Sequence, residues 1–349
     1  MNQKIPARLF LLGLTAIAAT IFTGCDKKNS GTVATGEKFT VVDTRTDNFD
    51  YARAKANAQD AMASVPDLAC MVGLFAYNAP QCMEAAKEAG KIGSIKIVSF
   101  DEADAVLQGI ADGTVVGTIS QQPYYYGYES VRILSGLASG SGKKKLAYVT
   151  NGVDPFWNTA VAGVRAAEKE FGVECEVLMP PKGAVDQKRM IEGIIARGVD
   201  GMAISPVDAK NQVDLINEAA ARFPVITHDS DAPDSKRLCF VGMDNYKAGR
   251  AAGKLVKSAL PQGGKVMIFV GRLEQLNAQQ RRQGVVDELL DRPSPTTSAP
   301  TKVDAPSVAS GDKSALPPNG YLEIPIVEVT KANVEKFRVD LKKMQEAGK

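Results

Sequence analysis

The sequence predicts an α/β protein made of two doubly wound lobes, each with a parallel sheet covered by helices on both faces. Short runs of β-branched and other apolar residues alternate with helical stretches along most of the chain. Such βαβ repetition is typical of parallel sheets whose faces are both buried under helices. About ten strand–helix units are more than one sheet comfortably holds. Two lobes are therefore expected.

Each element is predicted from its own residue pattern. In the helix expected at 157–171, Trp157, Val161, Val164, Ala167 and Phe171 recur at steps of three and four residues and mark one buried face. The expected strands are 39–43, 69–74, 95–100, 146–150, 173–179, 201–205, 225–227, 238–242, 265–270 and 321–329. The other expected helices are 51–64, 80–89, 186–197, 213–223, 246–260, 277–290 and 332–344.

The N-terminus has the pattern of a secretory signal at residues 1–24. Lys4 and Arg8 precede an apolar run that is too short for a permanent membrane span. Small residues then precede Cys25, and a polar segment follows it. This resembles a bacterial lipobox, which implies that Cys25 carries the lipid and that residues 25–36 form a tether. A plain cleaved signal is the alternative.

Composition limits the classes of function. The net charge of +2 comes from 42 basic and 40 acidic residues spread along the chain, so no basic stripe predicts nucleic-acid binding. One histidine and widely spaced cysteines leave little for zinc, and no cofactor or metal is expected. Cys70 and Cys175 read as core residues, while a disulfide among these two, Cys82 and Cys239 remains open.

Three short motifs have alternative interpretations. Residues 140–143 (GSGK) lack the spacing of a phosphate-binding P-loop and are interpreted as a flexible joint. His228 follows a strand end, where open α/β sheets bind ligands, and a binding role is favoured over a catalytic one. Asp154, Phe156 and Trp157 can bind a sugar through stacking and hydrogen bonds, although core packing explains Trp157 equally well.

Eight segments together resemble the ribose-type periplasmic binding proteins, and they cover nearly everything outside the signal and the Pro-rich stretch. Four come from the second half: 146–157 (LAYVTNGVDPFW), 225–229 (VITHD), 241–245 (VGMDN) and 277–284 (NAQQRRQG). Four come from the first half: 42–49 (VDTRTDNF), 73–78 (GLFAYN), 97–101 (IVSFD) and 117–123 (GTISQQP).

The resemblance implies a set of ligand contacts, position by position. Ser230 stands where ribose binders often carry arginine, which puts D-ribose itself in doubt. Carboxylates, an amide and a guanidinium group can each engage adjacent sugar hydroxyls in paired hydrogen bonds. Asp101 and Gln121 are implied at or near the hinge crossings. The other implied contacts are Asp154, Phe156, Trp157 and Asp229 on one lobe, and Arg281, Phe49 and Asn78 on the other.

The order of the blocks departs from the family, in which the block like 145–290 comes first. The resemblance therefore implies a circularly permuted order, either natural or rearranged by construction. We expect one lobe from 102–140 with 145–231, and the other from 37–101 with 237–290. Residues 291–320 are expected to form a Pro-rich linker, and residues 321–349 a strand and helix that cross the hinge.

The resemblance implies a monomeric, periplasmic protein, held at the membrane only by the lipid on Cys25. It would capture a monosaccharide, such as a ribose-like pentose, and deliver it to an ABC transporter permease without catalysing a reaction. A sugar sensor or the effector domain of a regulator is the first alternative. A sugar-processing enzyme is the second, and turnover of a bound sugar would distinguish it.

Overall fold

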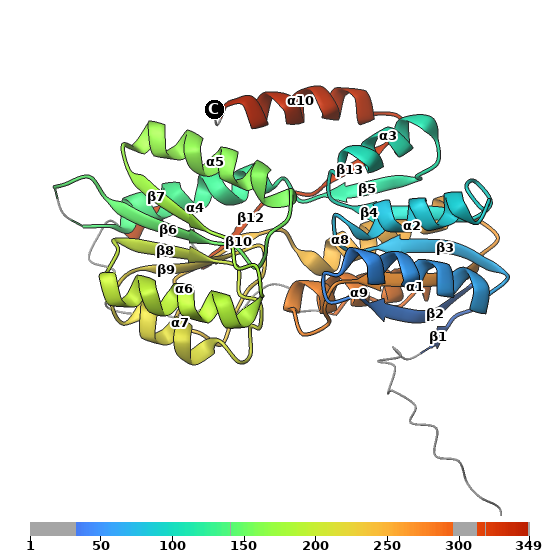
Figure 1. The fold of residues 1–349 in the computed structure, drawn as a ribbon, viewed down its shortest axis with the longest axis horizontal. Coiled ribbons are helices and arrows are strands. Elements are labelled where there is room, and N and C mark those ends of the chain that lie inside the picture. The colour runs from blue at the N-terminus through green and yellow to red at the C-terminus, as the bar shows by residue number, and fades with distance from the viewer. Residues whose placement is uncertain (1–32, 140, 296–312, 318, 348–349) are drawn as a thin grey trace, which may run out of the picture.

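The computed structural model describes residues 33–139, 141–295, 313–317 and 319–347. Within these ranges the strands form one sheet of seven strands and one of six. Each sheet is the centre of its own lobe, and the two lobes lie side by side (Figure 1). Cys25 and the signal lie outside the described residues, as do residues 296–312 of the Pro-rich segment.

The seven-stranded lobe draws its strands from both ends of the chain. Its strand order is β1-β2-β11-β3-β4-β5-β13, parallel except for the antiparallel edge strands β1 and β13. The strands are β1 (Ala34–Thr35), β2 (Phe39–Thr46), β3 (Leu68–Gly73), β4 (Lys96–Phe100), β5 (Gly117–Ser120), β11 (Gly264–Val270) and β13 (Val327–Thr330). The helices are α1 (Tyr51–Ser64), α2 (Asn78–Glu88), α3 (Asp104–Asp112), α8 (Asn245–Ala259) and α9 (Leu276–Leu289).

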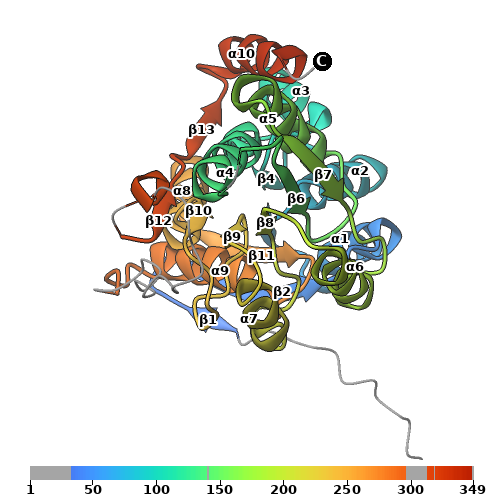
Figure 2. The ribbon, with the colours of Figure 1, turned by 90° about the vertical axis from the view of Figure 1, so that its left-hand side faces the viewer.

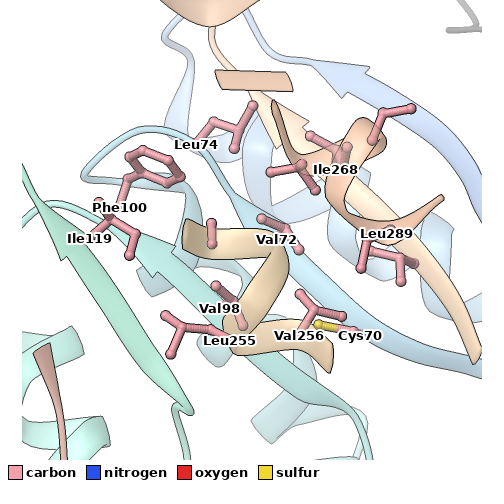
Figure 3. Close-up of a cluster of buried hydrophobic side chains, with 14 of the residues drawn as sticks. Cys70, Val72, Leu74, Val98, Phe100, Ile119, Leu255, Val256, Ile268 and Leu289 are labelled. Atoms are coloured by element: carbon pink, nitrogen blue, oxygen red, sulfur yellow. The ribbon is translucent and has the colours of Figure 1, made fainter. Parts of the chain in front are cut away.

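Alternation along the central strands explains how this sheet fills two cores. Cys70 and Val72 of β3 pack on the side covered by α8 and α9, as Figure 3 shows. Met71, which lies between them, packs on the side covered by α1, α2 and α3. Successive side chains of a strand point to opposite faces, so a continuous apolar run serves both cores.

The six-stranded lobe has a fully parallel sheet in the order β12-β10-β9-β8-β6-β7. Helices α4 and α5 pack on one face of the sheet, and α6 and α7 on the other. The strands are β6 (Lys145–Val149), β7 (Glu174–Leu178), β8 (Gly201–Ile204), β9 (Val225–His228), β10 (Phe240–Gly242) and β12 (Tyr321–Glu323). The helices are α4 (Pro123–Leu137), α5 (Phe156–Phe171), α6 (Ala184–Arg197) and α7 (Val213–Ala220).

Glycines allow one pair of helices in each lobe to pack backbone against backbone. A Cβ atom on Gly163 of α5 would lie 1.9 Å from the carbonyl oxygen of Tyr124 in α4. A Cβ atom on Gly249 of α8 would lie 2.1 Å from the carbonyl oxygen of Arg281 in α9. The second contact fixes the backbone of a residue that the sequence predicts in the site.

In the described part of the chain, the lobes are joined by three crossings, at 121–122, 243–244 and 324–326. The side chain of Gln122 donates to the carbonyl oxygen of Pro325 at 2.6 Å. The Tyr126 hydroxyl donates to Gln121 Oε1 at 3.2 Å and accepts from the backbone N–H of Met243 at 3.2 Å. These bonds tie the crossings into one hinge.

The structure differs from the expected lobe boundaries in two places. Residues 102–120 were expected in the six-stranded lobe, but α3 and β5 belong to the seven-stranded lobe because β5 pairs with β4 and β13. Residues 237–242 were expected in the other lobe, but β10 pairs with β9 and β12. The chain therefore crosses at 121 and 243 instead of at 101 and 231–237.

The strand expected at 321–329 is two strands, one in each sheet. β12 ends the six-stranded sheet at Glu323, and β13 begins at Val327 in the seven-stranded sheet. Pro325 lies between them and has no backbone N–H to donate to a sheet. Helix α10 (Val334–Ala347) then lies over α3 of one lobe and α5 of the other, as both Figure 1 and Figure 2 show.

Candidate functional site

A cavity of ≈ 400 Å³ lies between the lobes and is lined by both. Its walls are loops that follow the carboxyl ends of strands in the two sheets. Open α/β sheets bind their ligands at this edge, because the loops there converge without covering helices. Eight of the nine predicted ligand contacts line the cavity: Phe49, Asp101, Gln121, Asp154, Phe156, Trp157, Asp229 and Arg281.

The ninth predicted contact, Asn78, lies behind the wall of the cavity. Its amide nitrogen donates to Asp47 Oδ2 at 2.9 Å, and its amide oxygen accepts from the backbone N–H of Phe75 at 3.0 Å. Tyr77 also donates to Asp47. Burial raises the pKa of Asp47 to about 7, against the lowering effect of these hydrogen bonds. Asn78 thus supports the loop that carries the wall residues Phe75 and Tyr77.

Left-handed backbone turns aim several of these side chains into the cleft. Asp101 and Asp229 are the first residues after β4 and β9, and their φ angles are 68° and 57°. Asn48 and Phe49, after β2, have φ angles of 58° and 63°. Aspartate and asparagine tolerate this conformation, whereas for phenylalanine it is strained. Strained residues concentrate at binding sites, where the surrounding structure holds them in place.

Arg281 is the polar centre of the cavity and is 1% exposed. Its guanidinium donates to Asn245 Oδ1 at 2.8 Å, to the carbonyl oxygen of Leu74 at 3.0 Å and to Gln121 Oε1 at 2.7 Å. The same group lies 3.7 Å from Asp229 Oδ1, which belongs to the opposite lobe. A buried fork of donors between two lobes can engage vicinal hydroxyls and bind both lobes at once.

Asp229 is held from its own lobe. Its Oδ2 accepts from Ser205 Oγ at 2.8 Å and from Asn151 Nδ2 at 3.0 Å. Burial raises the pKa of Asp229, and the neighbouring Arg281 lowers it. The carboxylate is therefore oriented by neutral donors on one side and faces the cation across the cleft on the other.

Asp101 lies at the base of the cleft beside the first crossing. Gln121 Nε2 donates to Asp101 Oδ1 at 2.5 Å, and burial raises the pKa of Asp101 while Arg281 opposes that rise. Gln121 therefore contacts Arg281 through its oxygen and Asp101 through its nitrogen. This amide couples the polar centre directly to the hinge.

Aromatic side chains form the apolar walls. Phe156 and Trp157, at the start of α5, meet edge to face with their ring centroids 4.9 Å apart. Trp157 is only 2% exposed and packs in the core of its lobe, and it also lines the cavity, so its contact with a sugar stays a prediction. On the opposite lobe Phe49 and Phe75 meet edge to face at 5.6 Å.

His228 has no access to the cleft, contrary to the expected binding role. The ring is fully buried and stacks on Tyr148, with centroids 4.1 Å apart. Its Nε2 lies 3.2 Å from the carbonyl oxygen of Val149, and its Nδ1 lies 3.1 Å from the Tyr148 hydroxyl. Burial lowers the pKa of His228 to about 3. It is a neutral core histidine, one residue before the aspartate that faces the site.

Sequence reasoning missed several lining residues. Asn151 lies inside a segment that resembles the family and Tyr51 lies close to another, while Lys182 and Arg272 lie in loops outside these segments. Tyr51 donates from its hydroxyl to Asp154 Oδ2 at 2.9 Å, a contact between the lobes. Asn151 directly follows the strand expected at 146–150, and this position at a strand end was the sequence signal for a lining residue.

The described residues give little support for a disulfide, a metal site or a membrane span. The four cysteines there, 70, 82, 175 and 239, are free and buried, and Cys70 and Cys175 lie in the core as expected. Within the same ranges no group of histidine, cysteine or acidic side chains is arranged to hold a metal ion. None of the described helices is both long and apolar enough to cross a membrane.

Two doubly wound lobes, a hinge of three chain crossings and a polar, aromatic cavity between the lobes define a two-lobed ligand-binding protein. The chain matches the family described as periplasmic binding protein domain over residues 19–144 and 147–315. It therefore belongs to this family, which confirms the family and the fold class expected from the sequence.

Individual relatives match part of the chain. A D-ribose/D-allose-binding protein of Pseudomonas aeruginosa is 29% identical over 159 residues, which are 42% of this chain and 50% of that protein. A ribose import binding protein of Bacillus subtilis is 29% identical over 138 residues, 38% of this chain and 45% of that protein. The chain spans about half the length of the curated relatives it matches.

One solved structure illustrates the similarity to crystallised proteins. It is an ABC transporter solute-binding protein from Burkholderia graminis in complex with D-arabinose. The sequence identity is 30%, the TM-score is 0.42, and the similarity covers 44% of this chain and 55% of that protein.

Proposed function

We propose that the protein captures a sugar between its two lobes in the periplasm and delivers it to an ABC transporter permease, without catalysing a reaction. The single observation that carries this proposal is the buried Arg281 fork, which lies 3.7 Å from Asp229 of the opposite lobe in a cavity with aromatic walls. The family and the sugar-binding names of the relatives support it.

The cavity chemistry suits a sugar ring. Hydroxyl groups can accept from Arg281 and Asn151 and donate to Asp101, Asp154 and Asp229. The C–H face of a ring can stack on an aromatic face such as that of Phe156. Water leaves these contacts when the lobes close, which strengthens each hydrogen bond in the cleft. A ribose-like pentose or a related monosaccharide fits this arrangement.

Closure of the two lobes around the sugar would let the transporter distinguish the sugar-bound form from the empty one. A ligand that touches both lobes favours the closed state over the open one, because only the closed state offers both sets of contacts. The hinge contacts of Gln121 and Tyr126 are the natural pivot for this motion. We further propose a monomer that is tethered to the membrane through a lipid on Cys25.

The circular permutation inferred from the sequence is part of this proposal, and strand order supports it. Counted from β6, the strands of the six-stranded sheet follow the order 2-1-3-4-5 that is common in doubly wound folds. The seven-stranded sheet has the same order only if β11 is counted first, followed by β2, β3, β4 and β5. The connection from α9 to β2 would then be the one that is broken here, since β2 lies near the N-terminus and the next strand after α9 is β12.

Calorimetric titration tests the binding function. The chain without residues 1–25 is titrated with pentoses, hexoses and sugar alcohols. We expect one sugar to bind with micromolar or tighter affinity and to raise the melting temperature. Turnover of the bound sugar, or a cooperative melt without any binding, would contradict the proposal.

The variant Arg281→Ala tests the site itself. Loss of the guanidinium leaves Asp229 buried opposite no cation, and we expect the affinity to fall by about a hundredfold or more. Arg338→Ala, which removes a partly exposed arginine of α10, is the matched control. A thermal melt establishes that both variants are folded, and unchanged affinity in folded Arg281→Ala would exclude the assigned site.

A further inference from the structure

The binding cavity continues into a second compartment of ≈ 600 Å³. The two spaces share the lining residues Tyr51, Tyr77, Asp101, Asp154 and Phe156, so they are neighbours along one cleft. Small-molecule sites typically range from about 300 to 1,000 Å³ and enclose most of their ligand. A cleft of this combined size extends well beyond the polar centre around Arg281.

Two stacked tyrosines lie at the border of the compartments. Their rings are 4.8 Å apart and nearly parallel, with an angle of 10° between the planes. Tyr77 is almost completely buried, while Tyr51 is 44% exposed and reaches Asp154 with its hydroxyl. The exposed tyrosine face, held in place by the ring behind it and by Asp154, is a rigid surface for a flat apolar group.

Glu102 lines the second compartment but not the first. Both carboxyl oxygens are buried, and among the described residues neither has a hydrogen-bond partner of acceptable geometry, although Ser120 lies near. Burial raises the pKa of Glu102, and the adjacent Asp101 adds to the rise. The carboxyl oxygens are therefore closed to the compartment, and Glu102 lines it through the rest of the residue.

Helix α10 closes the far end of this compartment. Gln345 lines it and donates from its side chain to Thr159 Oγ1 of α5 at 3.1 Å. Figure 2 shows α10 above α5 and α3, so the compartment is bounded by both lobes and by the C-terminal helix. Thr159, Gln81 and Asn158 add hydroxyl and amide groups to the lining.

We propose that this second compartment binds a second sugar ring, so that a disaccharide or a short glycoside is bound more tightly than a monosaccharide. The inference rests on the proposed sugar-binding function. One ring occupies the cavity around Arg281, the glycosidic oxygen passes the stacked tyrosines, and the second ring lies against Gln81, Asn158 and Thr159.

Paired titrations test this extension with defined probes. D-xylose is compared with xylobiose, D-glucose with maltose and cellobiose, and D-galactose with lactose, using the chain without residues 1–25. We expect at least one disaccharide to bind roughly tenfold or more tightly than its own monosaccharide, because a second ring adds stacking on Tyr51 and hydrogen bonds to the hydroxyl and amide groups of the second compartment. Monosaccharide binding with no gain for any disaccharide would overturn the inference and leave the proposed function intact.

Two variants locate the gain. Val161→Trp fills the second compartment from α5, and Gln81→Ala removes one of its amide groups; neither residue lines the first cavity. Each should remove the roughly tenfold gain for the disaccharide and leave the affinity for the monosaccharide within about twofold. Glu335→Ala, on the exposed surface of α10, is the matched control. A gain that survives in both variants would place the second ring elsewhere, and failure of every sugar to bind would overturn both proposals.

Discussion

At the scale of single residues, the adjacent buried carboxyls Asp101 and Glu102 make stability depend on pH. Burial raises the pKa of both groups above their usual values near 4. Because the folded-state pKa is the higher one, their contribution to stability is fully present below pH ~4 and is lost as the pH rises toward the folded-state pKa. Buried His228 acts in the opposite direction below pH ~6.5, since its folded-state pKa is lowered.

Glu102→Gln isolates one of these contributions. At pH 5 the wild-type carboxyl is protonated, and we expect the variant to melt at nearly the same temperature. At pH 8.5 the wild-type protein either buries an ionised carboxylate or keeps its proton at a cost in free energy. The amide of the variant does not ionise, so the variant should melt several degrees higher. Differential scanning calorimetry without sugar gives the comparison, with exposed Glu335→Gln as the control. The hypothesis is falsified if both variants track the wild-type protein across this range.

Eight of the nine residues implied by the resemblance line the cavity, but they are a minority of its lining, and the sequence could not choose between neighbouring side chains. His228 and Asp229 both follow apolar strand residues, and either could have pointed into the cleft. The φ angle of 57° at Asp229 turns that side chain toward Arg281, while His228 keeps the strand conformation and packs on Tyr148. Asn78 lies behind the wall because its side chain binds the backbone of the loop that carries the wall residues. Such turns depend on packing that the sequence alone does not display.

At the scale of elements, the contact between α8 and α9 sets the position of Arg281. Gly249→Ala would place a methyl group 2.1 Å from the Arg281 carbonyl oxygen and force the helices apart. We expect a loss of about 1–3 kcal/mol in the free energy of unfolding, together with weaker sugar binding. Gly193→Ala in α6 is the matched control, because its new Cβ meets nothing closer than 3.5 Å. That substitution should stabilise the protein by up to about 1 kcal/mol. Urea denaturation measures both, and equal effects would contradict the packing argument.

Element types were predictable where periodicity was strong, whereas the membership of each element in a lobe was not. The helix at 51–64 was predicted at its observed bounds, since its buried alanines recur with helical spacing. β5 was assigned to the other lobe because the sequence of a short buried strand does not show which strands it pairs with. β12 and β13 were merged because the strand-like pattern of 321–329 continues on both sides of Pro325. Strand pairing between distant segments decides both cases.

At the scale of the whole molecule, the strand orders lead to a test of the proposed permutation. If β11 is the first strand of its sheet and β2 the second, the chain should tolerate restoration of that connection. In a reordered chain, residues 145–290 would be followed directly by 37–139 and then by 319–347. Every strand pair within the two sheets apart from edge strand β1 would be kept, and the hinge would still have its crossings. Domains commonly tolerate such changes when the breaks fall in exposed connections.

We expect the reordered chain to melt cooperatively and to bind the same sugar with an affinity within about threefold of the original chain, which corresponds to less than ~1 kcal/mol. The cleft should survive because its lining comes from loops and helices that follow strands whose neighbours are unchanged. Calorimetric titration of both chains, each with a melt, measures the outcome. A reordered chain that folds but does not bind would mean that the present order of segments is needed for the geometry of the site. In that case the strand order alone would not be the determinant of the lobes' relative position, and the crossing at 324–326 would be the first place to seek the difference.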